Sequence, residues 1–156
     1  MFLNTEKEGE LASVMCHELA HLSQRHYARS QNKVSPLTNA LMVLGSIAVA
    51  AASRNPEAIL IAPAAMQQMS INFTRSNEKE ADRIGFNNLV KAGFNPDDMT
   101  MMFQRMQSKY QNEDSEQFSY LMTHPLPSER LSDMRIRADA LEKNSKDSFR
   151  DNIDFY

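Results

Sequence analysis

The chain has 156 residues, of which 17 are basic and 20 are acidic, so its formal net charge is −3. This length predicts one domain with a short tail, and the charge balance does not indicate the clustered basic surface of a nucleic-acid-binding protein. The single cysteine, Cys16, excludes an intrachain disulfide framework and a multi-cysteine zinc finger.

Four glycines and six prolines are few for this length, and they favour helices over a sandwich or barrel. Apolar residues recur at helical spacing from near the N-terminus. Thr5 and Glu8 fit a capping box, with Asn4 as the alternative cap, for a first helix that we expect to reach about Arg29. We therefore predict a mainly α fold.

The middle of the chain predicts two further helices that are almost uncharged. Pro36 suits the first turn of a helix over about 37–52. Pro56 then begins a helix over about 57–71, which Pro63 should bend or interrupt.

No charged residue lies between Lys33 and Arg54, so a membrane-spanning helix has to be considered. Only the 13 residues 40–52 are steadily apolar. As a helix they reach about 20 Å, which is short of the roughly 30 Å hydrocarbon core. We therefore expect the apolar segment, over about 37–73, to be a buried hairpin or one that contacts a membrane peripherally.

The C-terminal half predicts a strongly amphipathic fourth helix that follows Glu78 and stops at Gly93. A fifth helix opens at Asn95 and Pro96 and carries several methionines, which we expect to form adaptable core. The last helix begins at Pro127 or Ser128. Only short strands are expected, around 71–74 or 118–122.

The segment His17-Glu18-Leu19-Ala20-His21 matches the pattern HExxH on the first expected helix. The two histidines lie on one helix face, about 6 Å apart along the axis, so both imidazoles can reach one metal ion. Glu18, at the edge of this face, can take the proton of a metal-bound water that attacks a carbonyl. The alternative for a bare motif is a solvated helix face with two histidines.

A second group, Glu78 and Asp82, makes the metal site the favoured interpretation. These carboxylates are four residues apart on a helix and point the same way. Glu78 can be a third ligand, and Asp82 can accept the far N–H of a ligating histidine and so set its tautomer. Without HExxH, a salt-bridged surface would be the better interpretation.

A third group combines His124, on a loop stiffened by two prolines, with Arg130 on the following helix. Such a histidine can approach a site, and the arginine could hold a carbonyl or a carboxylate. On spacing alone, a loop histidine and a surface arginine are favoured. His26 lies about 140° round its helix from His21, so we do not expect it to be a ligand.

Three ordered segments resemble the HtpX, Oma-type and CAAX-prenyl-protease family of zinc peptidases: HELAH at 17–21, TRSNEKEADRIG at 74–85 and THPLPSER at 123–130. The resemblance implies a zincin-like helical core of the gluzincin type. It predicts a metallopeptidase core over 1–143, followed by a polar tail over 144–156.

The resemblance also implies roles for individual residues. It implies one Zn²⁺ per chain with three protein ligands, namely His17, His21 and Glu78. It implies Glu18 as general base, and Asp82 as the partner of a ligating histidine. His124 would be a reversible fourth ligand or a catalytic donor, and Arg130 a contact for the substrate or transition state.

Members of this family carry about a hundred further residues before HExxH, and these form a sheet whose edge binds extended substrate. Only 16 residues precede His17 here, so we expect that sheet to be missing from this chain. The resemblance implies a periplasmic or other extracytoplasmic location, although residues 1–5 show no signal peptide.

We expect a zinc metalloendopeptidase that acts on polypeptides such as misfolded envelope proteins. The alternatives are a non-proteolytic zinc-binding or chaperone-like module and an inactive fragment.

Overall fold

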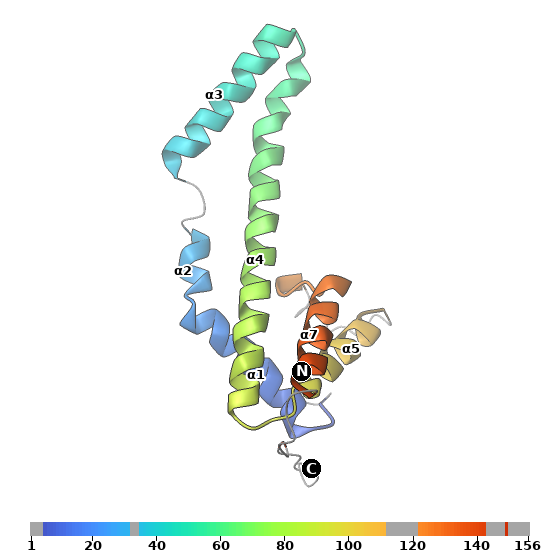
Figure 1. The fold of residues 1–156 in the computed structure, drawn as a ribbon. Helices are drawn as coiled ribbons and strands as arrows, with labels where there is room; N and C mark the ends of the chain where they lie inside the picture. The colour runs from blue at the N-terminus through green and yellow to red at the C-terminus, as the bar shows by residue number, and fades with distance from the viewer. Residues whose placement is uncertain (1–4, 32–34, 112–121, 143–148, 150–156) are drawn as a thin grey trace. The chain divides into compact units, whose positions relative to one another are not determined.

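The computed structural model describes residues 5–31, 35–111, 122–142 and 149. Within these ranges every element is helical and no strand occurs, which confirms the prediction of a mainly α fold (Figure 1). The elements are α1 (Glu8–Ser23), α2 (His26–Gln31), α3 (Pro36–Ser53), the 3₁₀ turn η2 (Pro56–Leu60), α4 (Ile61–Lys91), α5 (Asp97–Gln111) and α7 (Ser128–Glu142). The chain divides into two compact units: unit 1 comprises residues 1–24 and 78–156, and unit 2 comprises residues 25–77.

The first predicted helix is wrong in its extent and in its cap. α1 ends at Ser23, and Arg25 has a φ of 53°, which a right-handed helix cannot continue, before α2 begins at His26. Lys7 occupies the N-cap position of α1, and no side chain caps the helix there. Thr5 is therefore not at the N-cap position that the expected capping box requires.

In unit 2, α3 confirms the predicted second helix. Ser35 precedes it, and its side-chain oxygen accepts a hydrogen bond of 3.1 Å from the backbone N–H of Thr38. Pro36 lies in the first turn, where its missing N–H would have no partner inside the helix.

The predicted third helix over about 57–71, which Pro63 was expected to bend or interrupt, is wrong in its extent. η2 precedes α4, which starts at Ile61, so Pro63 falls in the first turn, where no intrahelical hydrogen bond is lost. α4 then runs for 31 residues without a break, so the third and fourth predicted helices are one. The segment 71–74, expected to form a short strand, is helical. The second expected strand covered 118–122; residues 118–121 lie outside the described residues, and Met122 is helical.

The chain reverses direction after α4, and this reversal builds the core of unit 1. Gly93 has a φ of 87°, and the N–H groups of Gly93 and Phe94 donate to the carbonyls of Val90 and Leu89, which closes the helix end as predicted. α5 then packs against α1 and α7. The buried core residues are Val14, Phe86, Leu89, Met99, Met102, Phe103, Met106, Met134 and Ala138.

The methionines of α5 confirm the expectation of a methionine-lined core only in part. Met99, Met102 and Met106 are buried in it, whereas Met101 is exposed. The tail predicted over 144–156 lies outside the described residues, apart from residue 149.

Candidate metal centre

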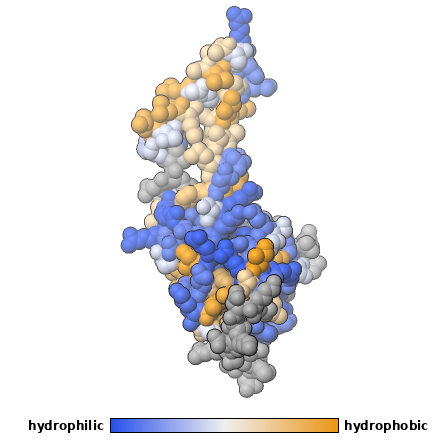
Figure 2. Space-filling model, viewed as in Figure 1, coloured by the Kyte–Doolittle hydropathy of each residue, from blue (hydrophilic) through white to orange (hydrophobic). Residues whose placement is uncertain are grey.

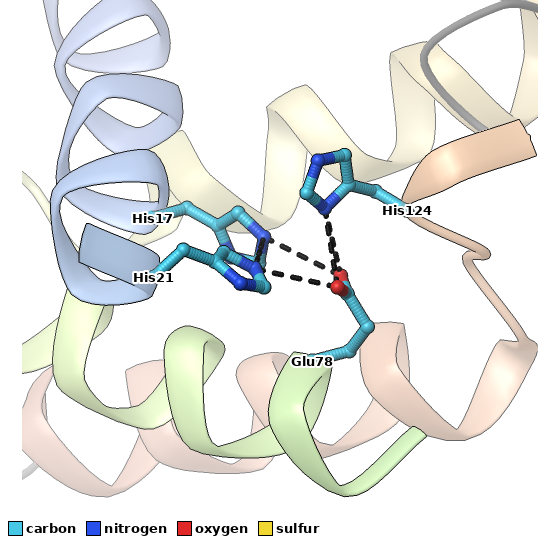
Figure 3. A group of neighbouring side chains, drawn as sticks. All are labelled: His17, His21, Glu78 and His124. Carbon is cyan, nitrogen blue, oxygen red and sulfur yellow. Dashed lines mark hydrogen bonds and ion pairs between the residues drawn. The ribbon is translucent and has the colours of Figure 1, made fainter. Parts of the chain in front are cut away.

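Four side chains from three separate parts of the chain converge in unit 1 (Figure 3). α1 supplies His17 and His21, α4 supplies Glu78, and the segment before α7 supplies His124. One possible ligand atom from each residue lies within 4.8 Å of the other three. The structure thus brings the three predicted ligands together with the histidine expected to approach them.

The distances between the donor atoms fit a single small metal ion. Nε2 of His17 lies 3.0 Å from Nε2 of His21 and 3.4 Å from Oε2 of Glu78. Nε2 of His21 lies 3.3 Å from Oε1 of Glu78. Nitrogen and oxygen ligands about 2 Å from a tetrahedral zinc ion lie about 3.3 Å from one another. The two imidazoles and the carboxylate could therefore bind one zinc ion with little rearrangement.

His124 stands between Glu78 and Glu18. Its Nδ1 lies 3.1 Å and 3.2 Å from the two carboxylate oxygens of Glu78, and its Nε2 lies 3.6 Å from Oε1 of Glu18. Its ring centre is 5.0 Å from that of His21. The His124 ring therefore occupies the space between the expected third ligand and the expected general base.

Behind the donors, Arg130 and Asp82 form a buried ion pair. Nε and Nη2 of Arg130 each donate a 2.6 Å hydrogen bond to the Asp82 carboxylate, and the two residues are only 4% and 1% exposed. Oδ1 of Asp82 also lies 3.0 Å from Nδ1 of His17, within ion-pair distance. Asp82 thus links α7 to the ligand His17.

Arg130 reaches two further parts of the site. Its Nη1 donates a 2.6 Å hydrogen bond to the carbonyl oxygen of Pro125 and lies 2.9 Å from Oε2 of Glu78. Its guanidinium carbon lies 5.3 Å from the ring centre of Phe103, a distance typical of a cation–π contact. The structure therefore places Arg130 inside unit 1, where it connects Glu78, Asp82 and the segment that carries His124.

The charges of these groups favour a cation at the site. Burial opposes ionisation of Glu78, but contacts with His124, His17, His21 and Arg130 outweigh it and hold the pKa of this carboxyl well below its usual range. Burial likewise opposes ionisation of Asp82, yet Arg130 and His17 lower its pKa. Glu78 is therefore ionised, as a carboxylate that binds a metal ion must be.

His17 shows the converse effect. Burial favours the neutral imidazole, but the neighbouring carboxylates of Asp82 and Glu78 outweigh it and raise the pKa of His17. His26, by contrast, begins α2, is buried, and is not in the four-residue donor group. Its exclusion from the ligand set stays a prediction.

Two contributors to the site are not apparent from the sequence. Phe103 looks like an ordinary core aromatic, and only the structure places its ring against Arg130. Gly85 looks like one member of an amphipathic helix, but a Cβ atom there would lie 3.0 Å from both Cα and N of His17. A glycine inside a helix is the signal that could have indicated this close approach.

A helical core that presents HExxH and a glutamate from a second helix is typical of metallopeptidases. The chain matches the family model described as Peptidase family M48 over residues 1–138, and it belongs to that family. This result confirms the family resemblance that the three sequence motifs indicated.

The similar proteins include β-barrel assembly-enhancing proteases. The chain is 42% identical to the Yersinia pestis protein of that name over 97% of its own length, and 41% identical to the Escherichia coli K12 protein over 90%. A Vibrio cholerae relative, to which the same name is given provisionally, is 47% identical over 88% of the chain. The chain spans only 32%, 30% and 29% of these three relatives, respectively.

Proposed function

We propose that this chain forms the metal-binding part of a zinc metalloendopeptidase. The observation that carries the proposal is the convergence of His17, His21 and Glu78, whose donor atoms lie 3.0–3.4 Å apart, next to Glu18. When bound, zinc acts as a Lewis acid and lowers the pKa of a water molecule. Membership of the M48 family supports the same chemistry.

Glu18 is the proposed general base. It follows His17 directly in the sequence, and its side chain is 43% exposed. A carboxylate there can accept the proton of that water and return it to the leaving amine.

Asp82 and Arg130 are proposed as positioning residues. Asp82 lies against the far nitrogen of His17, where it favours the tautomer whose Nε2 is free to bind a metal. Arg130 holds Asp82 and Glu78 from behind, and it is 4% exposed. These contacts favour an indirect role for Arg130 over the direct substrate contact expected from the sequence.

His124 is proposed to keep the site latent. Its ring contacts the carboxylates of both Glu78 and Glu18, so it lies where a substrate carbonyl and its attacking water would have to enter. A displaced His124 could instead donate a hydrogen bond to the developing oxyanion.

The relatives' names support a proposal about substrates and location. Proteins named for enhancing β-barrel assembly point to polypeptides of the bacterial envelope, such as misfolded or stalled β-barrel proteins. The site would then work outside the cytoplasm, in the periplasm. Because the chain spans about a third of these relatives, other parts of the longer proteins would contribute to substrate choice.

The second candidate is a zinc-binding or chaperone-like module without proteolysis. It is favoured by the eleven large apolar side chains that unit 2 exposes between residues 37 and 71, because such side chains can hold unfolded clients.

One experiment separates the two candidates. Bound zinc and casein cleavage are measured for the native chain and for Glu18→Gln. We expect one zinc per chain in both, with cleavage by the variant lowered at least about 100-fold. Zinc in both without cleavage in either would favour the binding module, and a native chain that binds no zinc would contradict both candidates.

A further inference from the structure

Helix α3 carries its apolar side chains on the outside. Of its residues only Ser46 is buried, and α3 is long and apolar enough to cross a membrane by length and composition. The exposed apolar side chains of unit 2 continue from α3 through η2 into α4: Leu37, Leu41, Val43, Leu44, Ile47, Val49, Ile59, Leu60, Ile61, Met69 and Ile71. Figure 2 shows hydrophobic residues gathered over α3. Exposed patches of this extent mark interaction surfaces.

The charges of the chain are distributed unevenly between its two units. Residues 25–77 contain five basic residues and one acidic residue, a net charge of +4, whereas the rest of the chain contains 12 basic and 19 acidic residues, a net charge of −7. Three of these basic residues precede the apolar segment, one lies within it at the turn after α3, and one follows it: Arg25, Arg29, Lys33, Arg54 and Arg75. The exposed apolar side chains of α3, η2 and the start of α4 thus lie in the cationic part of an acidic chain.

We propose that unit 2 docks on the surface of an anionic phospholipid membrane. Apolar side chains flanked by arginine and lysine suit the boundary between acyl chains and negatively charged headgroups. An apolar protein partner would account for the exposed leucines, but it would not require the excess of positive charge. Anionic lipid satisfies both features, and the proposal does not depend on peptidase activity.

The polar residues around α3 indicate that it lies along the membrane surface. Its 18 residues extend about 27 Å, which is slightly less than a hydrocarbon core of roughly 30 Å. Arg54 caps its C-terminus and Glu57 lies in the first turn of the following η2, so a spanning helix would have to carry both charges across. If α3 and the first part of α4 spanned the membrane as a hairpin, α4 would also place Gln68 and Asn72, which are joined by a 2.9 Å hydrogen bond, among the lipid chains.

Vesicle flotation of the full 156-residue chain tests the proposal. Vesicles of phosphatidylcholine alone are compared with vesicles containing about a third phosphatidylglycerol, at low and high salt. We expect at least tenfold stronger binding to the anionic vesicles, weakened by salt. Arg54→Gln should lower the affinity about fivefold, the effect of one basic residue near such a surface.

A matched pair of substitutions tests the apolar contribution. Leu44→Asp in α3 and Ile136→Asp in α7 each replace an exposed side chain, 62% and 66% exposed respectively. We expect Leu44→Asp to lose at least about tenfold in vesicle binding and Ile136→Asp to lose nothing. Circular dichroism checks that each variant keeps its helices. If Leu44→Asp does not fold, the vesicle binding of Arg54→Gln tests the proposal in its place.

Several results would overturn the proposal. These are no vesicle binding by the native chain, equal binding to neutral and anionic vesicles, or equal losses for the two Asp variants. A dimer in solution that Leu44→Asp dissociates, without vesicle binding by the native chain, would instead assign α3 to a second copy of the chain.

Discussion

Arg130 and Asp82 lie on different helices, and each places a charge in the interior of unit 1. Removing one partner of a buried ion pair leaves the other charge buried without compensation, whereas an exposed pair loses little. The chain contains both kinds of pair between α4 and α7. Lys79 and Glu129 lie 2.6 Å apart, but they are 52% and 70% exposed.

We predict that Arg130→Ala lowers the free energy of unfolding by about 3–5 kcal/mol. Lys79→Ala, the matched control, should lower it by less than about 1 kcal/mol. Urea unfolding followed by circular dichroism measures both. Equal losses would show that the Arg130–Asp82 pair does not organise unit 1.

His124 is the residue whose two expected roles predict opposite results. Because its ring lies between Glu78 and Glu18, we predict that His124→Ala raises the rate of casein cleavage. The rate is measured at equal zinc content. Loss of cleavage would assign His124 as a catalytic donor, and an unchanged rate would contradict both roles.

At the scale of elements, the site depends on how closely α4 approaches α1. A Cβ at Gly85 would lie 3.0 Å from two backbone atoms of His17 and 3.2 Å from the carbonyl carbon of Cys16. Backbone atoms cannot turn away as a flexible side chain can, so a larger residue must push the helices apart. The absence of a side chain at Gly85 therefore lets α4 lie close to α1, which sets the distance between His17 and Glu78, two turns earlier on α4.

We predict that Gly85→Ala destabilises the chain by about 1–3 kcal/mol and weakens zinc binding. At Gly45, on the exposed surface of α3, a Cβ atom would meet nothing within 4 Å apart from its chain neighbours and the adjacent backbone of its own helix. Gly45→Ala should therefore stabilise by about 0.5–1 kcal/mol. Thermal unfolding and zinc titration measure the two effects. Unchanged zinc affinity in Gly85→Ala would refute the positioning role.

At the scale of the whole molecule, the donors come from parts of the chain that are far apart in sequence. His17 and His124 are separated by more than one hundred residues, and Glu78 lies between them. One ion bound by these residues would join α1, α4 and the segment before α7, and a ligand that binds only the folded state stabilises that state.

We predict that removing zinc with a chelator lowers the melting temperature. With zinc at about 100 times its dissociation constant, the loss is about 2.7 kcal/mol, or roughly 5–10 °C for a chain of this size. His17→Ala should melt at the same temperature with and without zinc. A native chain that does not respond to the chelator would mean that the donors do not bind zinc in the folded state.

The features that the sequence predicts correctly depend on local geometry. The period of a helix places His17 and His21 on one face, and the glycine at 93 ends α4 because it accepts a positive φ. The errors concern how local signals combine. Pro63 breaks a helix only if it falls beyond the first turn, and α4 begins just before it.

The sequence by itself determined the helical class, the pairing of His17 with His21 and of Glu78 with Asp82, and the membership of the M48 family. Only the tertiary structure decided that the two pairs meet, that His124 lies between Glu78 and Glu18, and that Arg130 is buried. The physical reason is that helical periodicity acts over a few residues, whereas these contacts join residues at least 46 positions apart and depend on how α1, α4, α5 and α7 pack.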